Sequence, residues 1–155
     1  MESMESRMVK LYARNNNHVA LHAIPGHFAT SHSHINFYID MTSLKTRANE
    51  AQEVAKSLAG DYVNSTVVDT IVCMDGTEVV GAYLAQEFEK RGFRNTNLHD
   101  TIYIVTPEYN ANNQLIFRDN TIPAIKGKNV ILLLATTTTG LTVRRSQECV
   151  QYYGG

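Results

Sequence analysis

The sequence contains little cysteine, and its cysteines are not spaced for a bridge or a metal. The only two, Cys73 and Cys149, lie far apart and form no C-x-x-C pair. Disulfide-stapled proteins carry several cysteines and zinc knuckles space theirs closely, so both classes are excluded. We expect a reduced, cytoplasmic environment in which the two thiols act as small packing groups.

Long hydrophobic runs and an excess of one charge are also missing. No segment approaches the roughly 18 consecutive apolar residues of a membrane-spanning helix. Residues 1–6 are acidic and polar, where a secretory signal is basic and then apolar. The 14 basic residues nearly balance the 15 acidic ones, so no general field attracts nucleic acids or anionic membranes. We expect a soluble cytoplasmic protein without nucleic-acid or membrane partners.

Repeats and linkers rich in proline or glycine are absent as well, so residues 1–155 are interpreted as a single domain. The apolar spacing predicts helices that alternate with strands. Residues 44–59 carry a helical stripe with Thr42 or Ser43 as N-cap and Gly60 at the C-terminal end. The other predicted elements are strands at 67–72, 101–105 and 129–135 and helices at 79–88, ending at Gly92, and 141–153. Such alternation predicts an α/β fold with a mostly parallel sheet.

The segment between the second and third predicted strands is unusually long. Residues 106–127 are rich in asparagine and contain Pro107 and Pro123. Connections of this length are uncommon in compact domains and are often lids or disordered. We therefore expect a long mobile loop here.

Two turns follow predicted strands and are candidates for binding an anion, because ligands of open α/β sheets bind at the carboxyl ends of the strands. One contains Thr136, Thr137, Thr138, Thr139 and Gly140 directly before a helix. Its hydroxyl and N–H groups could hold a phosphate, or the threonines could simply cap the helix. The other turn, Cys73 to Thr77, has the same character with fewer hydroxyls.

The common nucleotide-binding motifs do not fit. Gly76 and Gly81 have the glycine spacing of a P-loop, but Ala82 and Tyr83 stand where lysine and serine or threonine are required. No G-x-G-x-x-G follows a predicted strand. A P-loop NTPase and a dinucleotide-binding fold are therefore disfavoured.

The order of these segments resembles the type I phosphoribosyltransferases. The signature of that family is an apolar strand, two acidic residues, a short segment with Thr-Thr-Gly and a helix. Here 130–133, then Thr138-Thr139-Gly140, then 141–153 follow the same order. The orotate phosphoribosyltransferase branch is most similar, because Phe28-Ala29-Thr30-Ser31-His32 and Phe37-Tyr38-Ile39-Asp40 resemble its amino-terminal segment.

This resemblance implies a three-layer α/β fold, with a small N-terminal hood over 1–42 and a core over 43–155. It implies transfer of 5-phosphoribosyl from phosphoribosyl diphosphate to a nucleobase, orotate being the nearest acceptor in pyrimidine biosynthesis, with Mg²⁺ and a homodimer. It also implies three groups of binding residues: Thr136, Thr137, Thr138, Thr139, Gly140, Leu141 and Thr142 for the 5-phosphate; Met74, Asp75, Gly76 and Thr77 for the diphosphate; Phe28, Ala29, Thr30 and Ser31 for the base.

Several departures from the family pattern leave the catalytic residues unassigned. Leu134 and Ala135 replace the acidic pair, and His32 replaces a glycine of the base-side segment. Arg118 is the only basic side chain from 101 to 125, where the family carries lysine and histidine around the leaving diphosphate. A divergent transferase is one interpretation. The alternative is a catalytically impaired module that binds a phosphate, a nucleotide or another phosphorylated metabolite, with a regulatory role.

Histidines gather near the amino terminus, at His18, His22, His27, His32 and His34. Two residues apart on an extended strand, His32 and His34 would point to one side, as metal ligands can. No cysteine or acidic partner is near until Asp40. We therefore interpret the segment as polar and partly exposed, and assign no metal.

Overall fold

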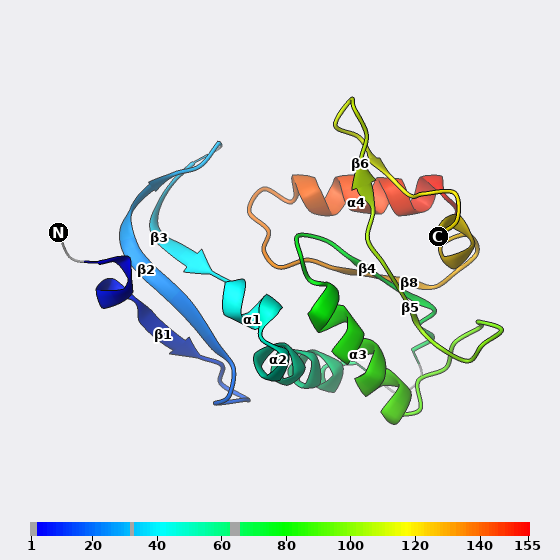
Figure 1. The fold of residues 1–155 in the computed structure, drawn as a ribbon, viewed down its shortest axis with the longest axis horizontal. Helices are drawn as coiled ribbons and strands as arrows, with labels where there is room; N and C mark the ends of the chain where they lie inside the picture. The colour runs from blue at the N-terminus through cyan, green and yellow to red at the C-terminus, as the bar shows by residue number, and fades with distance from the viewer. Residues whose placement is uncertain (1–2, 32, 63–65) are drawn as a thin grey trace.

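The computed structural model describes residues 3–31, 33–62 and 66–155. Its amino-terminal part is an antiparallel sheet that lies beside a mixed helix-and-strand core, as Figure 1 shows. Among the described residues, no helix is both long enough and apolar enough to cross a membrane. His32, and with it the suggested pairing of His32 with His34, lies outside the described residues.

The amino-terminal sheet is built from neighbours in sequence. A short 3-10 helix, η1 (Met4–Arg7), precedes β1 (Val9–Tyr12), β2 (Ala20–Ala29) and β3 (His34–Asp40). The strands pair antiparallel in the order β1-β2-β3, with a register shift in β2 between Pro25 and Phe28. Only Ala23 and Ile24 of this sheet are buried, whereas many of its large apolar side chains are exposed: Val9, Leu11, Tyr12, Phe37, Tyr38 and Ile39.

The helix predicted over 44–59 is two helices, α1 (Thr42–Thr46) and α2 (Ala48–Gly60). Arg47 separates them in an extended conformation, with φ −86° and ψ 120°. Leu44 is 3% exposed, so α1 has its own buried anchor and need not continue the axis of α2. The apolar stripe of α2 is as predicted, since Ala51, Ala55 and Ala59 are fully buried.

The core contains a parallel sheet in the order β5-β4-β8. β4 (Thr70–Cys73) lies between β5 (Tyr103–Val105) and β8 (Val130–Leu133), and all four of its residues are buried. A strand covered on both faces explains why Ile71, Val72 and Cys73 form an apolar run without polar alternation. The strand starts later than the sequence predicted, because Val67 makes only an isolated bridge to Arg94 and Asp69 binds neighbouring loops.

Helices cover both faces of this sheet (Figure 1). Ile71 and Cys73 pack in one cluster with residues of α2 and of α3 (Glu78–Lys90). Val72 and Met74, which alternate with them, pack with Val150 of α4 (Leu141–Tyr152). α3 and α4 agree with the predicted helices to within a few residues.

The long segment expected to be a mobile loop is folded. It forms the hairpin β6 (Glu108–Tyr109) and β7 (Leu115–Ile116) and a 3-10 helix, η2 (Ile122–Ala124). Phe117 and Ile125 are buried in the cluster that also contains Val150. Apolar residues at these two places, hidden among the asparagines, anchor the segment beside α4.

Candidate functional site

The ends of the three parallel strands meet at one edge of the core, and the two predicted anion-binding turns are bonded together there. The Met74 N–H donates to Leu133 O at 2.9 Å. The Thr77 hydroxyl is 2.8 Å from Met74 O and 3.2 Å from Leu133 O. Thr77 is only 3% exposed, so it serves as a buried tie between the turn after β4 and the end of β8.

The turn after β4 exposes its backbone. Asp75 and Gly76 both have positive φ, 56° and 75°, while Met74 and Thr77 on either side are buried. Glycine adopts this conformation without strain, and aspartate tolerates it better than most residues. The residue after the turn, Glu78, accepts a hydrogen bond from the Thr106 hydroxyl at 3.1 Å, which joins the end of β5 to the same edge.

A lysine that the sequence analysis missed lies against this turn. Lys45 of α1 donates from Nζ to Asp75 O at 2.8 Å. Nothing in the local sequence marks it, because the contact is made between residues 30 positions apart by the packing of α1. The only sequence signal for Lys45 is its position shortly after the Phe37–Asp40 segment, which carries the family resemblance.

The threonine-rich loop presents exposed hydroxyls before α4. Thr136, Thr137, Thr138 and Thr139 are all exposed. The residue at the N-cap position is Gly140, with φ 77°, and no side chain caps the helix from there. Thr139 Oγ1 is 3.4 Å from the Leu141 N–H. Thr139 thus accepts from the first helical N–H, while the N-cap position itself is a glycine without a side-chain cap.

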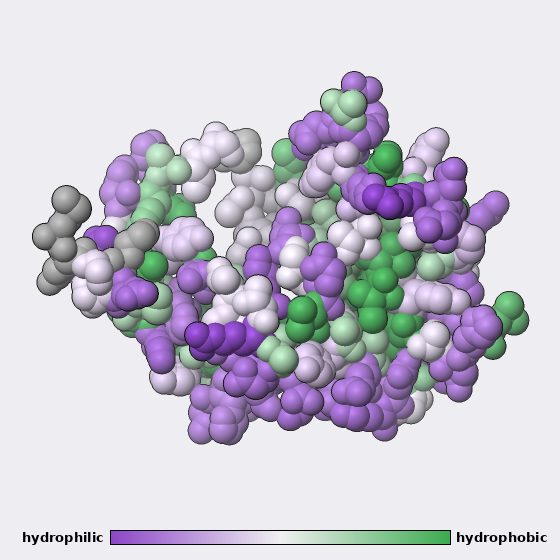
Figure 2. Space-filling model, in the orientation of Figure 1, coloured by the Kyte–Doolittle hydropathy of each residue, from purple (hydrophilic) through white to green (hydrophobic). Residues whose placement is uncertain are grey.

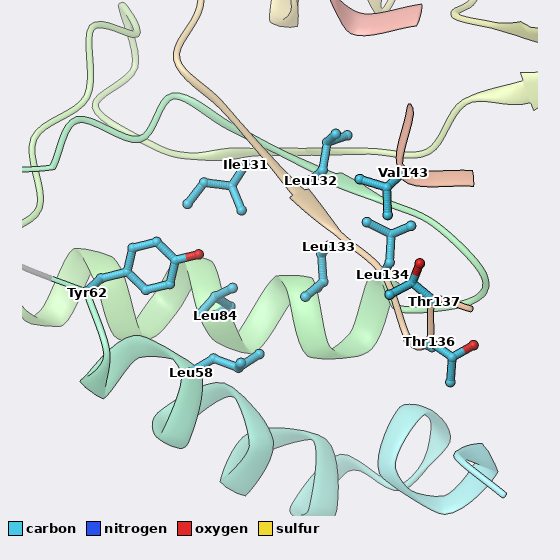
Figure 3. A pocket seen from close by; sticks show the side chains of 11 residues that line it. Leu58, Tyr62, Leu84, Ile131, Leu132, Leu133, Leu134, Thr136, Thr137 and Val143 are labelled. Carbon is cyan, nitrogen blue, oxygen red and sulfur yellow. The ribbon is translucent and has the colours of Figure 1, made fainter. Parts of the chain in front are cut away.

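Leu134 and Ala135, which the sequence analysis compared with the acidic pair of the resembled family, border an apolar cavity of about 320 Å³. Figure 3 shows it between β8 and the helices, with Ile131, Leu133, Leu58 and Leu84 along it and Thr136 and Thr137 at one end. The cavity lies on the α2 and α3 side of the sheet, and β8 pairs with β4 on one side only among the described strands. This cavity follows the uncovered edge of β8 and offers few polar partners to a sugar.

The residues predicted to face the base, Phe28 to Ser31, lie at the far end of the β2–β3 hairpin. Phe28 and Ala29 end β2, and the Phe28 ring lies 5.8 Å from the Tyr38 ring, centroid to centroid. The Thr30 hydroxyl and N–H both bond to Ser33 O across the turn, and Ser31 is exposed. Figure 2 shows a hollow between this hairpin and the core. The hairpin thus presents these residues beside the core, across open space.

Two of the histidines, His27 and His34, form a pair. His34 Nδ1 and His27 Nε2 are 2.9 Å apart, and their rings are 4.9 Å apart between centroids. In the part of the chain that the structure describes, no three His, Cys, Asp or Glu side chains form a group able to hold a metal.

The cysteines are poor nucleophiles in this fold. Burial raises the pKa of the Cys73 thiol to about 11, and burial also raises the pKa of Cys149. Because the thiolate is the reactive form, the raised pKa lowers the reactivity of both thiols at neutral pH. Both side chains pack against apolar clusters, in agreement with the packing expected from the sequence.

No family model matches the sequence, and no curated protein is similar to it at the sequence level. A solved structure that is similar in fold is orotate phosphoribosyltransferase of Mycobacterium tuberculosis H37Rv, in complex with Fe(III) dicitrate. The two share 15% sequence identity and a TM-score of 0.51, over 87% of this chain and 72% of that chain. At this identity the likeness concerns architecture alone, and the chain has a phosphoribosyltransferase-like mixed α/β fold.

Proposed function

We propose that this chain binds phosphoribosyl diphosphate at the carboxyl edge of its parallel sheet and transfers the 5-phosphoribosyl group to a nucleobase, with orotate the first acceptor to test. The observation that carries the proposal is the buried tie through Thr77, which holds the diphosphate-side turn against the end of β8. The phosphoribosyltransferase-like fold supports it.

Each loop has a part in this proposal. The segment from Thr136 to Thr142 binds the 5-phosphate through hydroxyls, N–H groups and the positive end of α4. Met74 to Thr77 binds the diphosphate, and Phe28 to Ser31 contacts the base. In the reaction, the bond from the anomeric carbon to the diphosphate oxygen breaks and a bond to a ring nitrogen of the base forms, with inversion. A cytoplasmic homodimer belongs to the same proposal.

The side chains at this edge do not form a Mg²⁺ site by themselves. Leu134 and Ala135 offer only carbon, and Asp75 is the exposed carboxylate of its turn. Mg²⁺ retains much of its water and binds readily through phosphate oxygens. Any Mg²⁺ here would therefore enter with the diphosphate and water rather than with a set of protein carboxylates.

A second function is a module that binds a phosphorylated metabolite without turnover. The lack of free positive charge in the long segment favours this second function. The charge of Arg118 in that segment is compensated by an ion pair with Glu108 at 2.5 Å. A leaving diphosphate needs compensating charge, which is a large part of catalysis in such sites. The two candidates share the binding loops and differ only in chemistry.

Calorimetric titration of the purified chain with phosphoribosyl diphosphate, with and without Mg²⁺, tests the proposal, and ribose 5-phosphate is the control ligand. Tight binding that requires Mg²⁺, followed by release of diphosphate on addition of orotate, is the expected result. Binding of both ligands without release would leave the binding module. Binding of neither ligand would reject both functions.

A charge placed on the threonine loop gives a second test. Thr138→Glu adds a carboxylate at an exposed position where the 5-phosphate is proposed to bind. We expect at least about tenfold weaker binding of both ligands, because like charges repel at short range. Asn49→Glu, at an exposed position on α2, is the matched control and should leave binding unchanged. Equal effects of the two substitutions on affinity would contradict the proposal that the 5-phosphate binds at this loop.

A further inference from the structure

Lys45 lies over the exposed backbone of the turn after β4. Its Nζ donates to Asp75 O at 2.8 Å, and a Cβ built on Gly76 would be 3.8 Å from the same nitrogen. The ammonium group therefore lies beside both positive-φ residues of the turn, at the edge where the strand ends meet.

The position of this side chain is set by α1. Leu44, its neighbour, is buried in the core. The Asp40 carboxylate accepts from the Thr42 N–H at 2.9 Å, and the Thr46 hydroxyl donates to Thr42 O at 2.7 Å. These bonds hold a helix of five residues at a fixed place, so Lys45 approaches the turn from a rigid base.

The positive charge of Lys45 has no direct ion-pair partner in the described part of the chain. Five other cations do form ion pairs with carboxylates: Arg47, Lys56, Lys90, Arg118 and Arg144. Lys45 uses one of its three N–H donors on a neutral carbonyl. The Asp75 carboxylate is exposed on the same turn and is not paired with Lys45. Asp40 is close enough to interact electrostatically with Lys45, and the exposed Glu78 follows the turn, so the ammonium group lies among several carboxylates.

We propose that Lys45 holds the diphosphate group of the substrate, donating its remaining N–H groups to diphosphate oxygens above the turn from Met74 to Thr77. This rests on the proposed function and adds to it the positive charge that the segment 106–127 does not supply. Asp75, on the same turn, opposes the anion and limits its affinity when no metal is present.

The test is calorimetric titration of the full chain with inorganic diphosphate in the absence of metal, and with ribose 5-phosphate. Lys45→Met removes the charge at nearly constant length and should weaken diphosphate binding about tenfold, since a charge-assisted hydrogen bond is lost. Lys45→Arg should retain most of the affinity. Binding of ribose 5-phosphate should stay unchanged, because its phosphate is assigned to the threonine loop.

Lys126→Met is the matched control, because Lys126 is exposed and precedes β8, at the opposite end of the sheet. Asp75→Asn keeps a residue that tolerates positive φ and should strengthen diphosphate binding. If circular dichroism shows that Lys45→Met does not fold, the affinity of Asp75→Asn for inorganic diphosphate serves as the test of the proposed diphosphate position.

The outcomes separate this inference from the proposed function. Suppose that the wild-type chain binds phosphoribosyl diphosphate, and that Lys45→Met binds inorganic diphosphate with the same affinity as the wild type. The role of Lys45 is then refuted and the proposed function stands. The role is also refuted if Lys45→Met loses both ligands to the same degree, or if Asp75→Asn weakens binding. If the wild-type chain binds neither diphosphate compound, both proposals fall.

Discussion

Asp69 is a fully buried carboxylate that holds three segments of the chain together. Its Oδ1 accepts from the N–H and the hydroxyl of Thr96, and its Oδ2 accepts from the N–H and the side-chain amide of Asn129. Burial alone raises the pKa of Asp69, but these hydrogen bonds outweigh burial and hold the pKa below its ordinary value. The charged form is therefore the one that the fold requires.

The stability of the chain should consequently fall in acid. A carboxyl group whose pKa is lowered by folding stabilises the native state above its unfolded pKa, about 3.9, and loses that contribution as the pH falls below it. Asp69→Asn presents an amide donor to groups that already donate. We expect it to lower the free energy of unfolding at pH 7 by roughly 2–4 kcal/mol and to flatten the pH dependence between about pH 5 and 2.

Urea unfolding of wild type and Asp69→Asn across this pH range measures the effect. Asp119→Asn, at an exposed position of the long segment, is the control and should change stability by less than about 0.5 kcal/mol. Equal stability of wild type and Asp69→Asn at pH 7 would contradict the importance of this carboxylate.

Some residues of the candidate site could be predicted from the local sequence, and others could not. The threonine loop, the turn at Gly76 and the base-side segment could be chosen from local sequence, because each follows an apolar run or lies in a segment that carries the family resemblance. Lys45 and Asp69 act through contacts 27 to 60 positions away. No local periodicity reports such contacts, so only the fold brings these two residues to light. Thr77 was predicted as part of its turn, but its bond to Leu133, 56 positions away, was not.

The packing of α3 on β4 depends on a glycine. A Cβ at Gly81 would overlap the sulfur of Cys73, so the helix approaches the strand at backbone distance. We expect Gly81→Ala to lower the free energy of unfolding by about 1–3 kcal/mol through overpacking. Gly60→Ala is the matched control, because nothing lies within 4 Å of its added methyl group and the change should stabilise α2 by about 0.5–1 kcal/mol.

A double-mutant cycle with Cys73→Ala tests the mechanism of this effect. Removing the sulfur should recover part of the stability lost in Gly81→Ala, and the coupling energy should exceed about 0.5 kcal/mol. Thermal or urea unfolding of the four proteins gives the value. If the two substitutions are additive, the loss comes from elsewhere in α3.

At the scale of elements, the strength of the hydrophobic pattern decided what could be predicted. α3 and α4 follow their predicted ranges closely, because α3 has a long apolar stripe and ends near Gly92, and α4 begins directly after Gly140. The helix over 44–59 is interrupted at Arg47 without any glycine or proline to announce it. The hairpin β6–β7 has strands of two residues each, too short for an alternation to be recognised.

The molecule as a whole divides into a well-buried core and a thinly buried sheet. Among β1, β2 and β3 only Ala23 and Ile24 are buried, whereas every residue of β4 is. Local opening requires less free energy where few apolar contacts are broken. Native-state hydrogen exchange should therefore show the amides of β4 as the slowest to exchange and those of β1 among the faster ones. Equal protection of the two strands would indicate that the parts open as one unit.

The sequence separation between paired strands also governs how this chain can assemble. The strands of the amino-terminal sheet are neighbours along the chain, whereas β4 pairs with β8 and Asp69 bonds to Asn129 across 60 positions. Contacts of long range are slow to form because a large loop must close first. During synthesis, β4 therefore lacks this neighbour until β8 has left the ribosome, and its apolar side chains stay exposed for that interval.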